Sequence, residues 1–260
     1  MRGCVVKTLR SSLSSLVYFG LRWFGNGKPG CRILCYHRVN DQDQSYTTVS
    51  RAQFELQMEH LASGGYRMVK LSNLLNGSLR ASSVAITFDD GFRDNYEVAF
   101  PIMRKRGLTA TIFLIAEKIG TDGYLTKPQI LKMAEAGFEF GSHTTTHPEL
   151  PALSFEEKRA EVCESKLWLE RELGIPIHYF CYPKGLYDEE AVDLVRMARY
   201  RGACSNRPGF NRYQNGKSVN PYLLKRTEIA DQDTPDDFKK KLGGAYDWLH
   251  QGLHWMRGRP

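Results

Sequence analysis

The sequence predicts an α/β fold in which about seven parallel strands alternate with helices and close into a barrel. Short runs that are almost wholly apolar recur along the chain and are separated by longer amphipathic stretches. That pattern is typical of a parallel sheet whose faces are covered by helices, and so many repeats favour a closed barrel over an open sheet. The 260 residues, 42% hydrophobic and 25% charged, have the composition of a globular protein. This excludes wholesale disorder, collagen-like chains and polytopic membrane proteins.

Residues 1–30 form a separate basic segment whose apolar residues recur at helical spacing. Its longest apolar run, 16–21, is too short for a secretory signal or a spanning helix, and no small-x-small cleavage site follows. Two interpretations stay open: an amphipathic helix that lies in a membrane surface, and a helix that packs on the folded domain. We divide the chain into this segment at 1–30, a folded domain at 31–250 and a C-terminal tail at 251–260.

Strands are predicted where the apolar runs are short and bounded by turn residues. The runs SVAITF at 83–88 and TATIFLI at 109–115 are typical of strands buried on both faces. The remaining strands are predicted at 31–39, 138–143, 178–183, 202–205 and 223–229.

Two helices are predicted to begin at capping boxes, in which a serine and a Gln or Glu three residues later cap each other's backbone. One box starts at Ser50, and its helix ends near Gly64–Gly65. The other starts at Ser154, and its helix runs to about Leu173 with Gly174 as the stop. Further helices are predicted over 188–199 and from about 234 to 250.

The charge balance and the cysteines indicate which partners and which redox environment the chain allows. Lys and Arg number 36 against 29 Asp and Glu, so the net charge is +7 at pH 7. This surplus permits an anionic partner or a membrane surface but does not select one, and we expect no nucleic-acid partner. The six cysteines show no C-x-x-C spacing, and several lie inside apolar runs. They predict reduced thiols and a cytosolic environment.

Three short motifs each follow a predicted strand at its carboxyl end, the edge where parallel barrels build their active sites. The first, TFDDG at 87–91, ends its strand with the adjacent carboxylates of Asp89 and Asp90. Such a pair is destabilising unless a cation lies close by. An ordinary Asp-Gly turn is the alternative interpretation.

The second motif, HTTTHP, places His143 and His147 four residues apart. Two imidazoles at this spacing can share one divalent ion, although the pattern also arises by chance. Combined with a carboxylate from the end of another strand, they predict a His₂–Asp metal site that leaves positions open for water and substrate.

The third motif, FCYPKG at 180–185, also ends a strand. Because Pro and Gly restrict its backbone, peptide N–H groups here can point into a cleft and hold an oxyanion. Taken alone, the motif is a strand-to-loop turn with an aromatic packing residue. The stretch 205–221, rich in Asn, Gly and Pro, is long for a connection, and we expect it to line a binding groove.

Together and in this order, TFDDG, HTTTHP and FCYPKG resemble the polysaccharide deacetylases, which are carbohydrate esterase family 4 or the nodulation protein B homology domain. The resemblance spans 33–247 and implies a distorted (β/α) barrel. It implies a metal-dependent hydrolase of non-peptide carbon–nitrogen bonds that removes N-acetyl groups from amino sugars. It further implies that Asp90, His143 and His147 bind one divalent metal, zinc with nickel or cobalt as alternatives, and that Asp89 is the general base.

The same resemblance implies further roles, with departures from the family pattern. It implies that the backbone N–H of Lys184, where many relatives have Tyr, holds the oxyanion, and we expect Tyr182 to offer an aromatic face to the sugar. At the position of Cys181 many relatives carry an Arg that orients the base. The family's later Arg motif suggests that Arg226 supplies this charge instead, the alternative being a surface cation on a strand.

The general acid is a second departure. Many relatives carry a histidine for this role in a carboxyl-terminal L-x-x-H motif, which the chain lacks. The sequence YHRV at 36–39 instead resembles the opening of the poly-N-acetylglucosamine deacetylase branch, in which the acid histidine precedes TFDD. We therefore assign His37 as the general acid, since an imidazole with an ordinary pKa of about 6.5 suits this task. A core histidine satisfied by the backbone is the alternative.

The resemblance implies deacetylation of N-acetylated amino sugars. The basic surface and the amino-terminal segment add the hypothesis that the substrate is an N-acetylated polysaccharide, or its lipid-linked precursor, in exopolysaccharide or cell-envelope biosynthesis. The expected partner is an N-acetylated glycan, with peripheral membrane contact through residues 1–30. We expect the chain in the cytoplasm or at the cytoplasmic face of a membrane. Two alternatives stay open: a deacylase of a single lipid-carrier-linked aminosugar, and a metal-bearing but inactive glycan-binding protein.

Overall fold

The computed structural model describes residues 30–43, 45–74, 82–212 and 220–247. The helix predicted within residues 1–30 and the tail at 251–260 lie outside the described residues. None of the described helices is long and apolar enough to cross a membrane.

Eight strands form the main sheet, and every strand pair in it is parallel. They are β1 (Cys31–Tyr36), β4 (Arg67–Met68), β5 (Ser83–Phe88), β6 (Thr111–Leu114), β7 (Glu139–Ser142), β8 (Tyr179–Cys181), β9 (Gly202–Cys204) and β10 (Thr227–Glu228). Their order is β10-β1-β5-β6-β7-β8-β9, and β4 pairs with the start of β5. Cys204 at the end of β9 also bridges to Leu224, just before β10, so the two edges of the sheet meet. The predicted distorted (β/α) barrel is confirmed.

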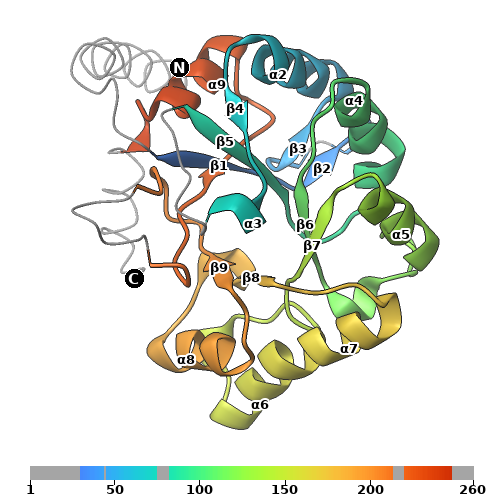
Figure 1. Ribbon diagram of the computed structural model, residues 1–260, viewed down its shortest axis with the longest axis vertical. Helices are drawn as coiled ribbons and strands as arrows, with labels where there is room; N and C mark the ends of the chain where they lie inside the picture. Colours follow the sequence, from blue (N-terminus) through green and yellow to red (C-terminus); the bar gives the residue numbers. More distant parts are fainter. Residues whose placement is uncertain (1–29, 44, 75–81, 213–219, 248–260) are drawn as a thin grey trace, which may run out of the picture.

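Helices lie around the outside of these strands (Figure 1). They are α2 (Arg51–Ser63), α4 (Phe100–Lys105), α5 (Lys127–Glu135), α6 (Phe155–Arg159), α7 (Ser165–Leu173), α8 (Glu189–Met197) and α9 (Pro235–Gly243). A π-helical turn, Ala160–Glu164, joins α6 to α7. The helix predicted to run from Ser154 to Leu173 is therefore confirmed, including its left-handed stop at Gly174, where φ is 67°.

The strands separate two apolar layers because their side chains alternate between the two faces of the sheet. The layer against the helices includes Leu34, Ile86, Ile112, Phe140 and Phe180. The layer inside the barrel includes Ile33, Ala85, Phe113, Tyr179 and Cys181.

The short helix α3 (Leu71–Leu74) closes one end of the barrel. Leu71 and Leu74 belong to the interior layer, and the Tyr179 hydroxyl donates to the Leu71 carbonyl at 2.9 Å. Tyr179 begins β8, so α3 lies at the amino ends of the strands. The carboxyl ends are left for the functional groups, as in other parallel barrels.

Most predicted strands are shorter in the structure by one to several residues, and three further features differ from the prediction. The helix predicted to reach His250 ends at Gly243, because Gly244 adopts φ 84° and caps it with a hydrogen bond to Lys240. The Ser50 hydroxyl caps α2 as predicted, but the Gln53 side chain donates to the Asp233 carbonyl rather than completing a capping box. The two-stranded sheet of β2 (Arg38–Val39) and β3 (Thr48–Val49) was not predicted.

The cysteines are as predicted. All five in the described part of the chain are free, and four of them are buried. They behave as small interior hydrophobes rather than as covalent links.

Candidate metal centre

The site lies where inward-facing positions continue past the carboxyl ends of three strands. Because side chains alternate between the two faces of a strand, His37 beyond β1, Asp89 beyond β5 and His143 beyond β7 lie over the barrel interior. Gly141, two residues before His143, has no room for a side chain, since a Cβ there would lie 2.6 Å from the Phe113 ring. The glycine therefore lets the Phe113 ring pack against the backbone of β7, two residues before His143.

The structure brings the three predicted metal ligands together. Oδ1 of Asp90 lies 3.6 Å from Nε2 of His143 and 3.6 Å from Nε2 of His147. All three potential ligand atoms lie within 4.8 Å of one another. Oδ1 of Asp90 is buried and has no hydrogen-bond partner in the part of the chain that the structure describes. A buried carboxylate oxygen of this kind is unfavourable unless another group satisfies it.

His143 is held in the form that binds a cation. Its Nδ1 lies 2.7 Å from the Cys181 carbonyl, which accepts a hydrogen bond from it, so the lone pair is on Nε2. Burial lowers the pKa of His143, although the nearby carboxylates of Asp89 and Asp90 act in the opposite direction. The neutral imidazole that results is the ligand form.

The two loops that carry the predicted ligands have unusual backbone angles. Asp90, Thr144 and His147 all adopt left-handed φ values, of 69°, 68° and 69°. The Thr144 hydroxyl accepts from the His147 N–H at 2.9 Å. The Glu161 carboxylate accepts from the two N–H groups between them, at 2.8 and 3.0 Å. Such strain persists only where the surroundings hold it, and it concentrates at functional sites.

These residues fit a single divalent cation. Two imidazoles and a carboxylate are the donor set of a catalytic zinc site that keeps a position open. Donors about 2.1 Å from a common centre in tetrahedral geometry lie about 3.4 Å apart, close to the 3.6 Å found between Asp90 and each histidine. The orphaned Oδ1 of Asp90 is the atom that such an ion would satisfy.

Asp89 differs from its neighbour Asp90 because it already has a cation. Arg226 binds it in a bidentate manner, with Nη1 2.6 Å from Oδ1 and Nη2 2.7 Å from Oδ2. The Asp89 side chain is only 3% exposed and that of Arg226 is fully buried. Burial alone raises the pKa of Asp89, but the Arg226 guanidinium outweighs it and holds that pKa well below its usual range.

Arg226 directly precedes β10, the last strand of the barrel, and is anchored at several points. It donates to the Ser205 carbonyl at 3.1 Å and to the Asn206 side chain at 2.6 Å. Its Nη2 lies 3.1 Å from the sulfur of Cys181. The small Cys181 side chain therefore leaves room for the guanidinium. The prediction that Arg226 brings the missing charge to Asp89 agrees with this geometry, and the surface-cation alternative is wrong.

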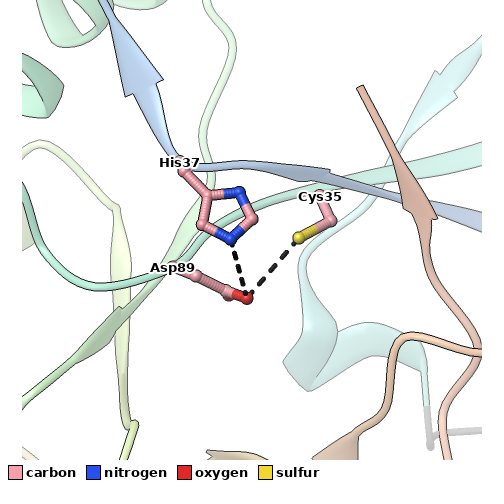
Figure 2. Close-up of side chains that lie close together, drawn as sticks. All are labelled: Cys35, His37 and Asp89. Carbon is pink, nitrogen blue, oxygen red and sulfur yellow. Dashed lines mark hydrogen bonds and ion pairs between the residues drawn. The ribbon is translucent and has the colours of Figure 1, made fainter. Parts of the chain in front are cut away.

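His37 faces the same carboxylate from β1, as Figure 2 shows. Its Nε2 lies 3.9 Å from Oδ2 of Asp89, and the thiol of Cys35 donates to that oxygen at 3.5 Å. The His37 side chain is 16% exposed. Its Nδ1 is buried without a partner among the described residues, so His37 is not a core histidine satisfied by the backbone.

Tyr182 does not lie in the site, and the expectation that it offers an aromatic face to the substrate is wrong. It is fully buried and packs against Phe180 and Tyr187, with ring centroids 5.3 and 5.1 Å away. The reason is the alternation of β8: Cys181 faces the barrel interior, so the residues on either side face the helices.

Lys184 occupies a strained turn beyond β8. Its φ is 54°, and its side chain is exposed and pairs with Glu149 at 2.8 Å. The following N–H groups of Gly185 and Leu186 donate to carbonyls within the turn. The Lys184 N–H makes no hydrogen bond to another described residue.

Sequence reasoning missed the residues that hold the His37 loop. The Asp94 carboxylate accepts from the Val39 N–H at 3.2 Å and from the Arg38 guanidinium at 3.2 Å. The Asn95 amide donates to the His37 carbonyl at 2.8 Å. The sequence does place Asp94 and Asn95 shortly after TFDDG, but only the fold shows that they lie beside β2.

Comparisons with known proteins agree with this geometry. The polysaccharide deacetylase family model matches residues 76–203. Putative polysaccharide deacetylase YxkH of Bacillus subtilis is 31% identical over 214 residues, covering 80% of this chain and 75% of its own. Poly-beta-1,6-N-acetyl-D-glucosamine N-deacetylase of Staphylococcus aureus is 27% identical, covering 78% of this chain and 73% of its own.

Among solved structures, the Streptococcus pyogenes deacetylase PplD in complex with acetate superposes with a TM-score of 0.75 at 25% identity. The match covers 83% of this chain and 99% of that one. The fold, the order of the three motifs and these similarities lead to one conclusion. The chain belongs to the polysaccharide deacetylase family, hydrolases that act on the carbon–nitrogen bonds of acetamido groups.

Proposed function

We propose that the protein removes acetyl groups from N-acetylglucosamine units of a polysaccharide by hydrolysing the acetamide bond. One observation carries the proposal. The potential ligand atoms of Asp90, His143 and His147 lie within 4.8 Å of one another, beside the carboxylate of Asp89, which is ion-paired with Arg226. The products are acetate and a free amine on the sugar. The named activity of the Staphylococcus aureus relative supports this substrate class.

Asp90, His143 and His147 would hold one divalent metal, for which we propose zinc, with nickel or cobalt as alternatives. A metal bound there supplies a Lewis acid that polarises the acetyl carbonyl and acidifies water. No sulfur atom belongs to this set of donors, although two other clusters near Asp89 include Cys35 or Cys181.

Asp89 is the proposed general base, which takes a proton from the attacking water. The bidentate contact with Arg226 keeps Asp89 ionised and fixes the direction of its oxygens. The Arg226 guanidinium holds the pKa of Asp89 below its usual range, so the carboxylate is ionised and can accept a proton. Arg226 is thus a positioning residue that acts through Asp89.

His37 is the proposed general acid, which donates a proton to the leaving amine. It enters from β1, whereas His143 and His147 enter from the loop after β7. Asp89 lies between them, with Oδ2 3.9 Å from His37 Nε2 and 4.0 Å from His143 Nε2. Base and acid are therefore close enough to act on one tetrahedral carbon. For the oxyanion on that carbon we propose the uncommitted N–H of Lys184 as a donor.

For the cellular setting, we propose action on an exopolysaccharide or its lipid-linked precursor at the cytoplasmic face of a membrane. The support is the basic, helically patterned sequence of residues 1–30, which we propose as a segment distinct from the domain at 31–250. Tryptophan fluorescence of the full chain titrated with anionic vesicles tests this. A blue shift that is lost in a variant lacking residues 1–30 supports it, and no change contradicts it.

The enzymatic proposal is tested by acetate release from β-1,6-linked N-acetylglucosamine oligosaccharides and from a lipid-linked aminosugar, using the zinc-loaded protein. We expect release from the oligosaccharide and at least a hundredfold loss of kcat in Asp89→Asn, because general base catalysis contributes about 10²–10⁴-fold. Asp193→Asn, an exposed carboxylate on α8, is the matched control. Release that is preserved in Asp89→Asn contradicts the mechanism, and release only from the lipid-linked sugar contradicts the polysaccharide assignment.

A further inference from the structure

The connection between β6 and α5 bridges the two loops that carry the proposed metal ligands. Its first part donates to the loop between His143 and His147, and its last part pairs with the loop after Asp90. The four backbone bonds are Ala116 to Thr144 (3.1 Å), Glu117 to Thr145 (3.1 Å), Arg93 to Gly123 (2.8 Å) and Leu125 to Gly91 (2.9 Å). The connection therefore forms part of the rim of the site.

Tyr124 lies at the point where this rim meets the Asp90 loop. It forms an antiparallel bridge with Phe92, and the two rings stack with centroids 5.1 Å apart and planes at 26°. The Arg38 guanidinium lies 4.5 Å from the Phe92 ring centroid. Arg38 is itself held by Asp43 and Asp94, at 2.9 and 3.2 Å. The Tyr124 ring is thus fixed by stacking rather than free to turn.

The Tyr124 hydroxyl is not used by the fold. The side chain is half-buried, and no hydrogen bond joins its hydroxyl to another described residue. The Leu125 N–H, next to Tyr124, donates to the Gly91 carbonyl at 2.9 Å, so Tyr124 lies against the loop that begins at Asp90. The hydroxyl of Tyr182, by contrast, is buried in the core, where no ligand can reach it.

We propose that Tyr124 binds substrate, with its hydroxyl hydrogen-bonded to the sugar ring that carries the acetamido group. The inference rests on the proposed function. When the acetamido carbon of a substrate lies between Asp89 and Asp90, the sugar ring that carries it lies against the rim formed by the connection between β6 and α5. A sugar is recognised by a pre-organised polar group beside an apolar surface. The stacked Phe92 and Tyr124 rings supply that surface, and the phenol supplies the polar group.

The test compares Tyr124→Phe with the parent, since this change keeps the stacked ring and removes only the oxygen. The readouts are KM and kcat for acetate release from a β-1,6-linked N-acetylglucosamine pentamer and calorimetric Kd for the same pentamer with metal-free protein. A third readout is hydrolysis of 4-nitrophenyl acetate, which has no sugar ring. We expect about a fivefold rise in KM and Kd, the equivalent of one neutral hydrogen bond. We expect kcat, 4-nitrophenyl acetate hydrolysis and zinc content to stay unchanged.

Tyr222→Phe is the matched control, because Tyr222 is also half-buried with a guanidinium, that of Arg196, 4.9 Å from its ring centroid. It precedes Leu224 on the segment that pairs with β9, toward the amino ends of the strands. Kd and KM unchanged in Tyr124→Phe overturn the proposal, as does a parallel loss on both substrates, which indicates a purely structural ring. A parent that binds the pentamer without releasing acetate contradicts the proposed function, while the ratio of Kd values still decides the role of Tyr124.

Discussion

Asp89 and Asp90 are neighbours in the chain, yet their surroundings are opposite. Asp89 is closed in by the Arg226 guanidinium and two thiols, with Cys35 and Cys181 at 3.5 and 3.6 Å from its Oδ2. Asp90 faces two imidazoles and has a buried oxygen without a hydrogen bond. A change of backbone direction at Asp90, where φ is 69°, sends the two side chains to different sides.

The difference teaches how one short motif supplies two functions. The charge of Asp89 is compensated by the protein itself, which keeps it ionised and oriented. The charge of Asp90 is left for a ligand. Variants that exchange or remove these partners should therefore have separable effects on metal content, stability and rate.

The largest expected effect comes from removing the ligand carboxylate. Asp90→Asn should lower kcat/KM for acetate release by about a thousandfold or more, because a bound metal stabilises the charge of the transition state and so lowers the activation free energy by several kcal/mol. Zinc content, measured by plasma mass spectrometry after dialysis, should fall in parallel. Asp122→Asn is the control, because Asp122 is fully exposed. This variant should keep the kcat/KM and the zinc content of the parent. Full zinc content in Asp90→Asn would remove Asp90 from the ligand set.

A large loss of stability is expected from removing the partner of Asp89. Arg226→Met leaves a buried carboxylate uncompensated, which costs about 3–5 kcal/mol in the free energy of unfolding. Urea denaturation measures it, with Arg196→Met at an exposed ion pair as the control, for which we expect less than about 1 kcal/mol. Arg226→Lys should recover only part of the loss, since one ammonium cannot reproduce the bidentate contact. Equal stability of the parent and Arg226→Met would contradict the pairing.

The pH dependence of stability sharpens the same contrast. The folded-state pKa of Asp89 lies below its unfolded value of about 3.9. The ion pair therefore stabilises the fold fully above that unfolded pKa, and the contribution is lost as pH falls below about 5. The gap in unfolding free energy between the parent and Asp89→Asn, both metal-free, should shrink by up to about 2 kcal/mol between pH 7 and pH 2.5. A gap that is constant with pH would show that Asp89 is not stabilised in its ionised form.

The smallest effect is expected at Tyr182, away from both carboxylates. Its buried hydroxyl has no partner among the described residues, so Tyr182→Phe should leave unfolding free energy unchanged or raise it by at most about 1 kcal/mol. The KM and kcat for acetate release should not change, because the ring faces the helices. A raised KM with unchanged stability would restore Tyr182 as a substrate contact.

Much of the fold and the core of the site could be predicted from sequence because local pattern and topology agree. The apolar run at 83–88 is a strand at those same residues, and parallel strands bring their carboxyl ends to one edge. That rule places TFDDG beside HTTTHP, although more than fifty residues separate Asp90 from His143.

What could not be predicted depends on direction and on distant contacts. The face occupied by Tyr182 depends on the register of β8, and a shift of one residue reverses it. The roles of Asp94 and Asn95 appear only when β2 lies beside the turn that follows β5. Tyr124 carries no motif, and its place beside Asp90 results from backbone bonds between two loops.

The central claim is that one divalent ion binds Asp90, His143 and His147 rather than the thiol-lined clusters around Asp89. X-ray absorption at the zinc edge of the zinc-loaded protein tests it most directly. We predict one ion per chain with a first shell of nitrogen and oxygen at about 2.0–2.2 Å and imidazole scattering beyond it. A sulfur shell at about 2.3 Å would place the ion at Cys35 or Cys181 and contradict the account.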